Sequence, residues 1–169
     1  MKLLVSLLAC VLCFVSCAGY HLGSIKPASL AKVQTIAVPM FSNGTLHPRA
    51  EVLATSAVAN AIVQEGTYRI SKVDNADAIL EGTVRSVKYS MIRGMPLDTL
   101  KPEELSNTLT IEWLLRDAKN PTKILASGTS SGTSQFFVSA NLQTARNNAL
   151  PEACEHAAES LVSTISNGY

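Results

Sequence analysis

The spacing of apolar residues along the chain predicts two helices of different lengths. In residues 49–65 apolar side chains recur every three or four positions, and Gly66 stands where a helix would end. A second helix is predicted for residues 142–166, with a kink or a broken start at Pro151, because proline removes a hydrogen bond and clashes with the preceding turn. The predicted buried face of the first helix comprises Leu53, Ala54, Ala57, Val58, Ala61 and Ile62.

Shorter runs rich in β-branched or alternating residues predict five strands. Alternation is cleanest in the fourth run, where Leu109, Ile111, Trp113 and Leu115 share one face. In the third run the apolar positions change parity, which predicts a β-bulge near Arg85 and Ser86. The segment 41–48, which contains Asn43-Gly44, is predicted to be a loop. The five strands are predicted at residues 33–38, 68–73, 78–92, 107–117 and 123–135.

The order of these elements is β-α-β-β-β-α, which predicts an α+β fold. The first two strands flank a helix and should be parallel, joined by a right-handed crossover. We expect a two-layer sandwich, with both helices on one face of a mixed sheet of four to five strands. The last strand carries only small residues on one face, Ala126, Gly128, Ser130 and Gly132, so a helix or a partner can approach it closely.

The first residues have the pattern of a lipoprotein signal. Lys2 supplies a positive start, and residues 3–15 are an apolar run that ends at the small residue Ser16. That run is shorter than the ~20 residues that a membrane-spanning helix needs. We predict removal of residues 1–16 and acylation of Cys17, followed by a tether over 17–32 and one domain over 33–169.

Other processing sites remain possible. Cys10 follows Leu7-Leu8-Ala9, which fits the lipobox letters better, but cleavage there would leave an apolar segment on the mature protein. Simple secretion or a retained anchor is a further alternative. Two or three acyl chains on Cys17 would hold the protein on a membrane without spanning it.

Charge and cysteine content argue against a nucleic-acid binder and against a disulfide-bonded fold. The chain has 14 basic and 13 acidic residues, and loss of Lys2 leaves 13 of each, so nothing indicates a nucleic-acid binder. After processing, Cys154 is the remaining thiol, and no intramolecular disulfide is predicted.

Candidate catalytic and metal-binding residues are few. Cys154 and His156 lie two apart on a helix and point in nearly opposite directions, so we interpret them as a core thiol and a solvent-facing histidine. His21 and His47 have no neighbouring ligand residues, so no metal and no cofactor are predicted. No nucleophile, base and orienting group can be assembled, and we predict that the protein is not an enzyme.

Three basic residues near apolar side chains are the best candidate binding site. Arg85, Lys88 and Arg93 recur along the third strand and its exit, in a stretch that also contains Tyr89 and Ile92. Guanidinium and ammonium groups bind phosphate, and methyl groups contact acyl chains, so this row suits a phosphorylated amphiphile. The alternative is a solvated strand face. Residues 94–106 are predicted to be a loop whose apolar residues either contact a partner or lipid, or fold over the core.

Several motifs together resemble the LptE family, the lipopolysaccharide-assembly lipoproteins of the outer membrane. Residues 17–23, Cys-Ala-Gly-Tyr-His-Leu-Gly, resemble the Cys-Gly-Tyr/Trp-His-Leu opening of mature members, with Ala18 as an extra residue. Further matches lie at Ile36, Val38, Pro39, Phe41, Asn43 and Thr45, in the helix that begins near Glu51, and at Ala76, Asp77, Ala78, Leu80 and Gly82.

The resemblance implies a binding and assembly role. LptE-like proteins plug the lumen of the LptD β-barrel in the outer membrane and assist insertion of lipopolysaccharide. Contact between lipopolysaccharide and Arg85, Lys88 and Arg93 is inferred from their chemistry, because the family motif does not include these residues. A free-standing periplasmic lipid-binding carrier or adaptor lipoprotein is the alternative, and a lipid-anchored hydrolase is the weakest one.

Overall fold

A computed structural model describes residues 26–95, 98–138 and 141–168, without the side chains of residues 95 and 98–102. The predicted signal, Cys17 and most of the predicted tether lie outside the described residues. Two short 3-10 helices, η1 and η2, accompany the strands and the two α-helices. In chain order the elements are η1 Ala28–Leu30, β1 Thr35–Ala37, β2 Ser42–Asn43, α2 Ala50–Glu65, β3 Arg69–Ile70, η2 Val73–Asn75, β4 Ala78–Met95, β5 Asp98–Asp117, β6 Ile124–Phe137 and α3 Leu142–Asn167.

The sheet is mixed and has the order β3-β1-β4-β5-β6. Strand β1 pairs in parallel with β3 and with β4, as expected for strands joined through a helix, and the long strands β4, β5 and β6 are antiparallel. The sixth strand, β2, lies in the predicted loop 41–48 and pairs with β4. The predicted fold class is confirmed, with one more strand than the four to five expected.

Strands β4 and β5 form a hairpin that is longer than predicted. The predicted loop 94–106 is wrong for most of its length, because Arg93 pairs with Glu104, Gly94 with Pro102 and Met95 with Asp98. Register shifts between these pairs accommodate Gly94 and Pro102 within the hairpin. The predicted bulge is confirmed, since Arg85 is the extra residue between the paired Val84 and Ser86.

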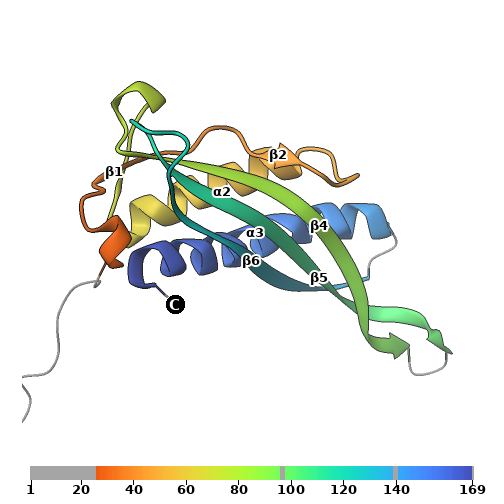
Figure 1. Cartoon of the computed structure of the whole chain (residues 1–169). Coiled ribbons are helices and arrows are strands. Elements are labelled where there is room, and N and C mark those ends of the chain that lie inside the picture. The colour runs from red at the N-terminus through yellow and green to blue at the C-terminus, as the bar shows by residue number, and fades with distance from the viewer. Residues whose placement is uncertain (1–25, 96–97, 139–140, 169) are drawn as a thin grey trace, which may run out of the picture.

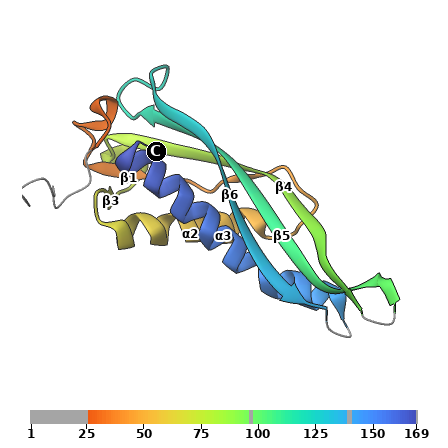
Figure 2. The same cartoon turned by 90° about the horizontal axis from the view of Figure 1, so that it is seen from below.

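Both helices cover the same face of the sheet (Figure 1; Figure 2). Helix α2 ends as predicted at Gly66, which has a left-handed φ of 81° and donates its N–H to the Ile62 carbonyl at 3.1 Å. Helix α3 continues through Pro151, so the broken start that we expected there is wrong. Burial of Leu150 and Ala153 on either side of the proline offsets the lost hydrogen bond.

The core lies between this face and the helices. All four alternating residues of β5 are buried there as predicted, and Leu161 of α3 is 0% exposed. Helix α3 approaches β6 so closely that a Cβ on Gly132 would lie 2.2 Å from the Ala153 carbonyl oxygen. The small residues of β6 therefore receive a helix of this chain. The buried β5 residues are Leu109, Ile111, Trp113 and Leu115.

Candidate functional site

In the described part of the chain, the opposite face of the sheet carries no helix, and it is lined by hydroxyl groups. Thr108 and Thr133 are cross-strand neighbours whose hydroxyl oxygens lie 3.1 Å apart, and Thr110 and Ser131 repeat this contact at 3.1 Å. Side chains alternate between the two faces of a strand, so these residues point away from the core. We call this surface the helix-free face.

Two ion pairs lie across the strands of the helix-free face. Arg85 of β4 donates from Nε to a carboxylate oxygen of Glu112 at 2.6 Å, and Arg116 of β5 donates to Glu81 at 2.9 Å. Both pairs are accessible to solvent, where an ion pair contributes about 0–1 kcal/mol to stability. They leave a polar surface with little net charge.

The structure brings all three predicted basic residues to the helix-free face. Arg85, Lys88 and Arg93 have mixed odd and even numbers, and an uninterrupted strand would separate them onto two faces. Register shifts after Val84 and after Met91 restore the alignment. The two bulges of β4 therefore assemble the predicted row.

The charges in this row are not equally available. Glu112 neutralises Arg85, and Glu104 lies 3.6 Å from the Nη2 atom of Arg93. Lys88 lies opposite Thr108 and makes no ion pair with any residue that the structure describes. Within the described part of the chain, Lys88 is therefore the cation of this row that no carboxylate neutralises.

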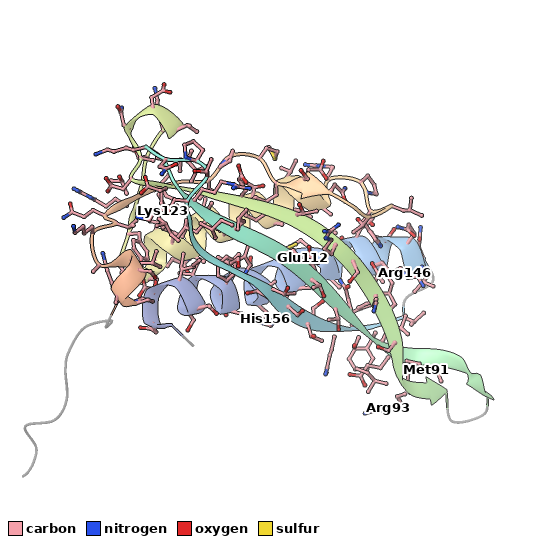
Figure 3. All side chains as sticks on the ribbon, in the orientation of Figure 1. Met91, Arg93, Glu112, Lys123, Arg146 and His156 are labelled. Carbon is pink, nitrogen blue, oxygen red and sulfur yellow. The ribbon has the colours of Figure 1, made fainter. Side chains whose placement is uncertain are left out.

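Apolar side chains surround the distal end of the row, where the β4–β5 hairpin extends past the helices (Figure 1). Ile92 is 46% exposed and Phe137 is 65% exposed. Arg93, Glu104 and Phe137 are successive neighbours across β4, β5 and β6, and Arg93 and Met91 are labelled there (Figure 3). A cation beside exposed apolar groups suits a ligand with both phosphate and hydrocarbon parts.

On the helix-covered side, the same end of the sheet holds a polar cluster that the sequence did not indicate. The Tyr89 hydroxyl lies 3.0 Å from Nε2 of His47, and the Arg146 guanidinium stacks 4.5 Å from the Tyr89 ring centroid. Burial raises the pKa of the Tyr89 phenol, although the nearby Arg146 charge opposes this. The cluster joins the segment before α2, strand β4 and the first turns of α3.

The remaining candidate residues lie in surroundings that indicate structural roles. Cys154 is 0% exposed, and desolvation raises the pKa of its thiol to about 12, so the thiolate needed for nucleophilic chemistry is disfavoured. His156 is exposed and donates to the Thr133 carbonyl at 2.7 Å. Among the described residues, no group of three or more potential ligands could hold a metal ion.

No helix in the described part of the chain is both long enough and apolar enough to cross a membrane. Cys17, the predicted lipidation site, lies outside the described residues.

The sequence did not indicate that carboxylates would neutralise two of the three basic residues. Alternation along residues 107–117 places Glu112 on the face away from the core. It does not give the register between β4 and β5, which aligns Glu112 with Arg85 and Glu104 with Arg93. Opposite charges on directly paired residues indicate such ion pairs, but this signal can be used only when the strand pairing is known.

Solved structures with the same fold include two lipoproteins. A minor lipoprotein from Acinetobacter baumannii has a TM-score of 0.53 and 12% identity, with 79% of this chain and 93% of that chain covered. Uncharacterized lipoprotein B from Nitrosomonas europaea has a TM-score of 0.52 and 14% identity, with coverages of 79% and 83%. At these identities the similarity shows the fold alone. None of the curated proteins compared with this sequence matches it.

Family membership comes from the sequence itself. The model of the LptE family, described as lipopolysaccharide-assembly, matches residues 33–165. The matched range begins just before β1 and ends in the last turn of α3, so it spans the whole sandwich. This chain belongs to the LptE family of lipopolysaccharide-assembly proteins.

Proposed function

We propose that this protein is a lipid-anchored subunit that assists lipopolysaccharide assembly by binding inside an LptD-type β-barrel of the outer membrane. The observation that carries the proposal is the family match over residues 33–165. Removal of residues 1–16 and acylation of Cys17 would tether the domain over 33–169 to the periplasmic side of the membrane.

The helix-free face supports binding inside a barrel. The interior of a large membrane barrel is polar. Hydroxyl groups and neutralised ion pairs, such as Arg85 with Glu112, can face such a wall without burying an unpaired charge. The protein acts by binding, without a reaction of its own.

Lipopolysaccharide contact is assigned to Arg85, Lys88 and Arg93. No carboxylate in the described part of the chain neutralises the Lys88 ammonium group, and Arg93 lies beside exposed apolar residues. Phosphate oxygens compete with Glu104 for Arg93 in this arrangement, because the Arg93 side chain is exposed and its contact with Glu104 is 3.6 Å long.

A free-standing lipid carrier would need room for acyl chains between its layers. The contact of α3 with Gly132 leaves no such room at β6. The hollow lined by Met40, Glu81 and Glu112 holds about 500 Å³ and opens to solvent, with two carboxylates in its wall. These features favour the barrel subunit.

Co-purification tests the proposal. The full-length lipoprotein is extracted from membranes in mild detergent, and its partners are identified and quantified by mass spectrometry. A β-barrel protein in a one-to-one ratio is expected. A monomer that carries bound lipid and no barrel would favour the carrier instead. Incorporation of radiolabelled acyl chains, lost in Cys17→Ala and retained in Cys10→Ala, tests the anchor.

A further inference from the structure

The direction of the backbone groups in β6 shows which of them face the edge of the sheet. Val138 donates its N–H to the Glu103 carbonyl of β5 at 2.9 Å, so even-numbered residues in this part of β6 point toward β5. Odd-numbered residues point outward, and the Thr133 carbonyl accepts a hydrogen bond from His156 on that side at 2.7 Å. Strand β6 is the last strand in the order, so these groups form its free edge.

Within the described ranges, part of this edge has no hydrogen-bonding partner. Helix α3 crosses β6 at Gly132. His156, which is labelled in Figure 3, donates a hydrogen bond to the Thr133 carbonyl there. Before that crossing, the outward N–H and C=O groups of Ser127, Thr129 and Ser131 have no hydrogen-bond partner among the described residues. We call Ser127, Thr129 and Ser131 the open edge.

The open edge lacks the features by which proteins block strand pairing. Exposed edges are commonly protected by short length, charged residues or proline. Strand β6 has 14 residues with no Asp, Glu, Lys, Arg or Pro. At the other end of the sheet, β3 has two residues, one of which is Arg69. One edge is blocked and the other is suited to accept a strand.

We propose that the open edge of β6 binds an extended segment of the barrel partner, which adds a strand to this sheet. The inference rests on the proposed function. The strands of a closed barrel are already paired, so the segment would come from a loop or plug that projects into the lumen. Its backbone would bond to Ser127, Thr129 and Ser131, as in other cases of β-strand addition.

A second copy of this chain fits the edge less well. Stable dimers bury about 800 Å² on each partner. The open edge offers three outward-facing residues per copy, a strip about 17 Å long and one strand spacing wide. If the β6 strands of two copies paired with Gly132 at the centre, the two α3 helices would lie about one strand spacing, or about 5 Å, apart. Packed helices need about 8–10 Å between their axes. A loop of an enclosing partner needs no large interface of its own, because it is held at high local concentration.

The chemistry of the edge restricts the segment. On the helix-free face the open edge presents the hydroxyl groups of Ser127, Thr129 and Ser131, and the residues between them on the other face are Gly128 and Ser130. Neither side offers a charge to pair with a charged residue of the incoming segment. The partner segment is therefore expected to be extended and uncharged over about five residues.

Hydrogen exchange of the purified complex, resolved to single amides, tests the proposal. The amides of Ser127, Thr129 and Ser131 are expected to exchange at least about tenfold more slowly in the complex than in the isolated lipoprotein. The amides of Ser130 and Gly132 bond to β5 in both states and serve as internal controls.

A variant gives an independent readout. Thr129→Pro removes an outward N–H while leaving the β5–β6 hydrogen bonds intact, and Thr129→Val is the matched control that keeps the N–H. We expect Thr129→Pro to reduce recovery of the barrel about tenfold in stringent washes, with Thr129→Val unchanged. If Thr129→Pro fails to fold, Thr129→Lys replaces it, because a lysine on an edge opposes strand pairing.

Other outcomes overturn the proposal in distinguishable ways. A one-to-one complex in which the three amides exchange as fast as in the free protein would refute edge binding and leave the proposed function standing. Absence of any barrel partner would refute both. Protection that appears in the isolated protein as its concentration rises would assign the edge to a second copy.

Discussion

The two faces of the sheet differ in what holds them together. The helix-covered face is apolar and closely packed, with Leu161 of α3 fully buried and α3 in contact with Gly132. The helix-free face has hydroxyl pairs and accessible ion pairs, such as Arg85 with Glu112. Burial contributes far more per residue than exposed ion pairs do. Stability therefore resides on one face, and the other can change with little effect on folding.

The largest effect is expected from removing a buried side chain. Leu161→Ala should reduce the free energy of unfolding by about 3 kcal/mol, because it deletes a fully buried side chain and leaves a cavity. The matched change on the other face is Leu114→Ala, whose residue is half-buried opposite Ser127, with an expected loss below about 1 kcal/mol. Urea unfolding measures both. Equal losses would contradict the difference between the faces.

Adding a methyl group at the closest contact should have the next largest effect. In Gly132→Ala the new Cβ would lie 2.2 Å from backbone atoms of Ala153 and Ala157, so α3 must shift away. We expect a loss of about 2 kcal/mol by thermal unfolding. Ser131→Ala, one residue away and pointing outward, should change stability by less than about 0.5 kcal/mol. A neutral Gly132→Ala would show that the layers are less tightly packed.

Asp77 provides a pH-dependent contribution that belongs to neither face. Backbone N–H groups of Gln34 and Thr35 donate to its carboxylate at 3.0 Å, and these hydrogen bonds lower its pKa below the usual 3.8. Because the folded pKa is lower than the unfolded one, the contribution is complete above about pH 4 and disappears as pH falls through the folded value.

Asp77→Asn should therefore destabilise the protein by about 1 kcal/mol at neutral pH, an amount reduced by solvent screening. The difference from the unmodified protein should shrink below pH 4. Urea unfolding at several pH values measures it, and Asp74→Asn, at an exposed carboxylate nearby, is the control. A difference that stays constant down to pH 2 would contradict this role of the charge.

The smallest effect is expected for the ion pair of Arg85 and Glu112. A double-mutant cycle with Arg85→Ala and Glu112→Ala should give a coupling energy below about 1 kcal/mol, because both side chains are about half exposed. The coupling should fall further in 0.5 M salt. A coupling above about 2 kcal/mol would make this face a contributor to stability.

Patterns set by local spacing were predictable from the sequence. The helix ending at Gly66, the alternation through Trp113 and the bulge at Arg85 follow from periodicity and backbone preferences, and each is present. The pairing register is not encoded in this way. For that reason the sequence pattern alone predicts a loop where the hairpin through Arg93 and Glu104 lies.

The candidate site was predictable in its cations but not in their surroundings. Arg85, Lys88 and Arg93 were found from their residue types along one strand. Their common face depends on two bulges, and their partial neutralisation depends on residues of β5. Long-range pairing decides both, and a single sequence gives little information about it.

The most direct test of the account is lipopolysaccharide binding by the full-length lipoprotein that lacks these three cations. Arg85→Ala, Lys88→Ala and Arg93→Ala are combined, and the control combines Arg69→Ala, Lys72→Ala and Lys119→Ala, which removes equal charge from exposed positions elsewhere. We expect affinity to fall about tenfold or more in the first variant only, since charged hydrogen bonds to phosphate are lost, with little change in unfolding free energy. Unchanged binding, or an equal loss in the control, would contradict the assignment of lipopolysaccharide contact to the helix-free face.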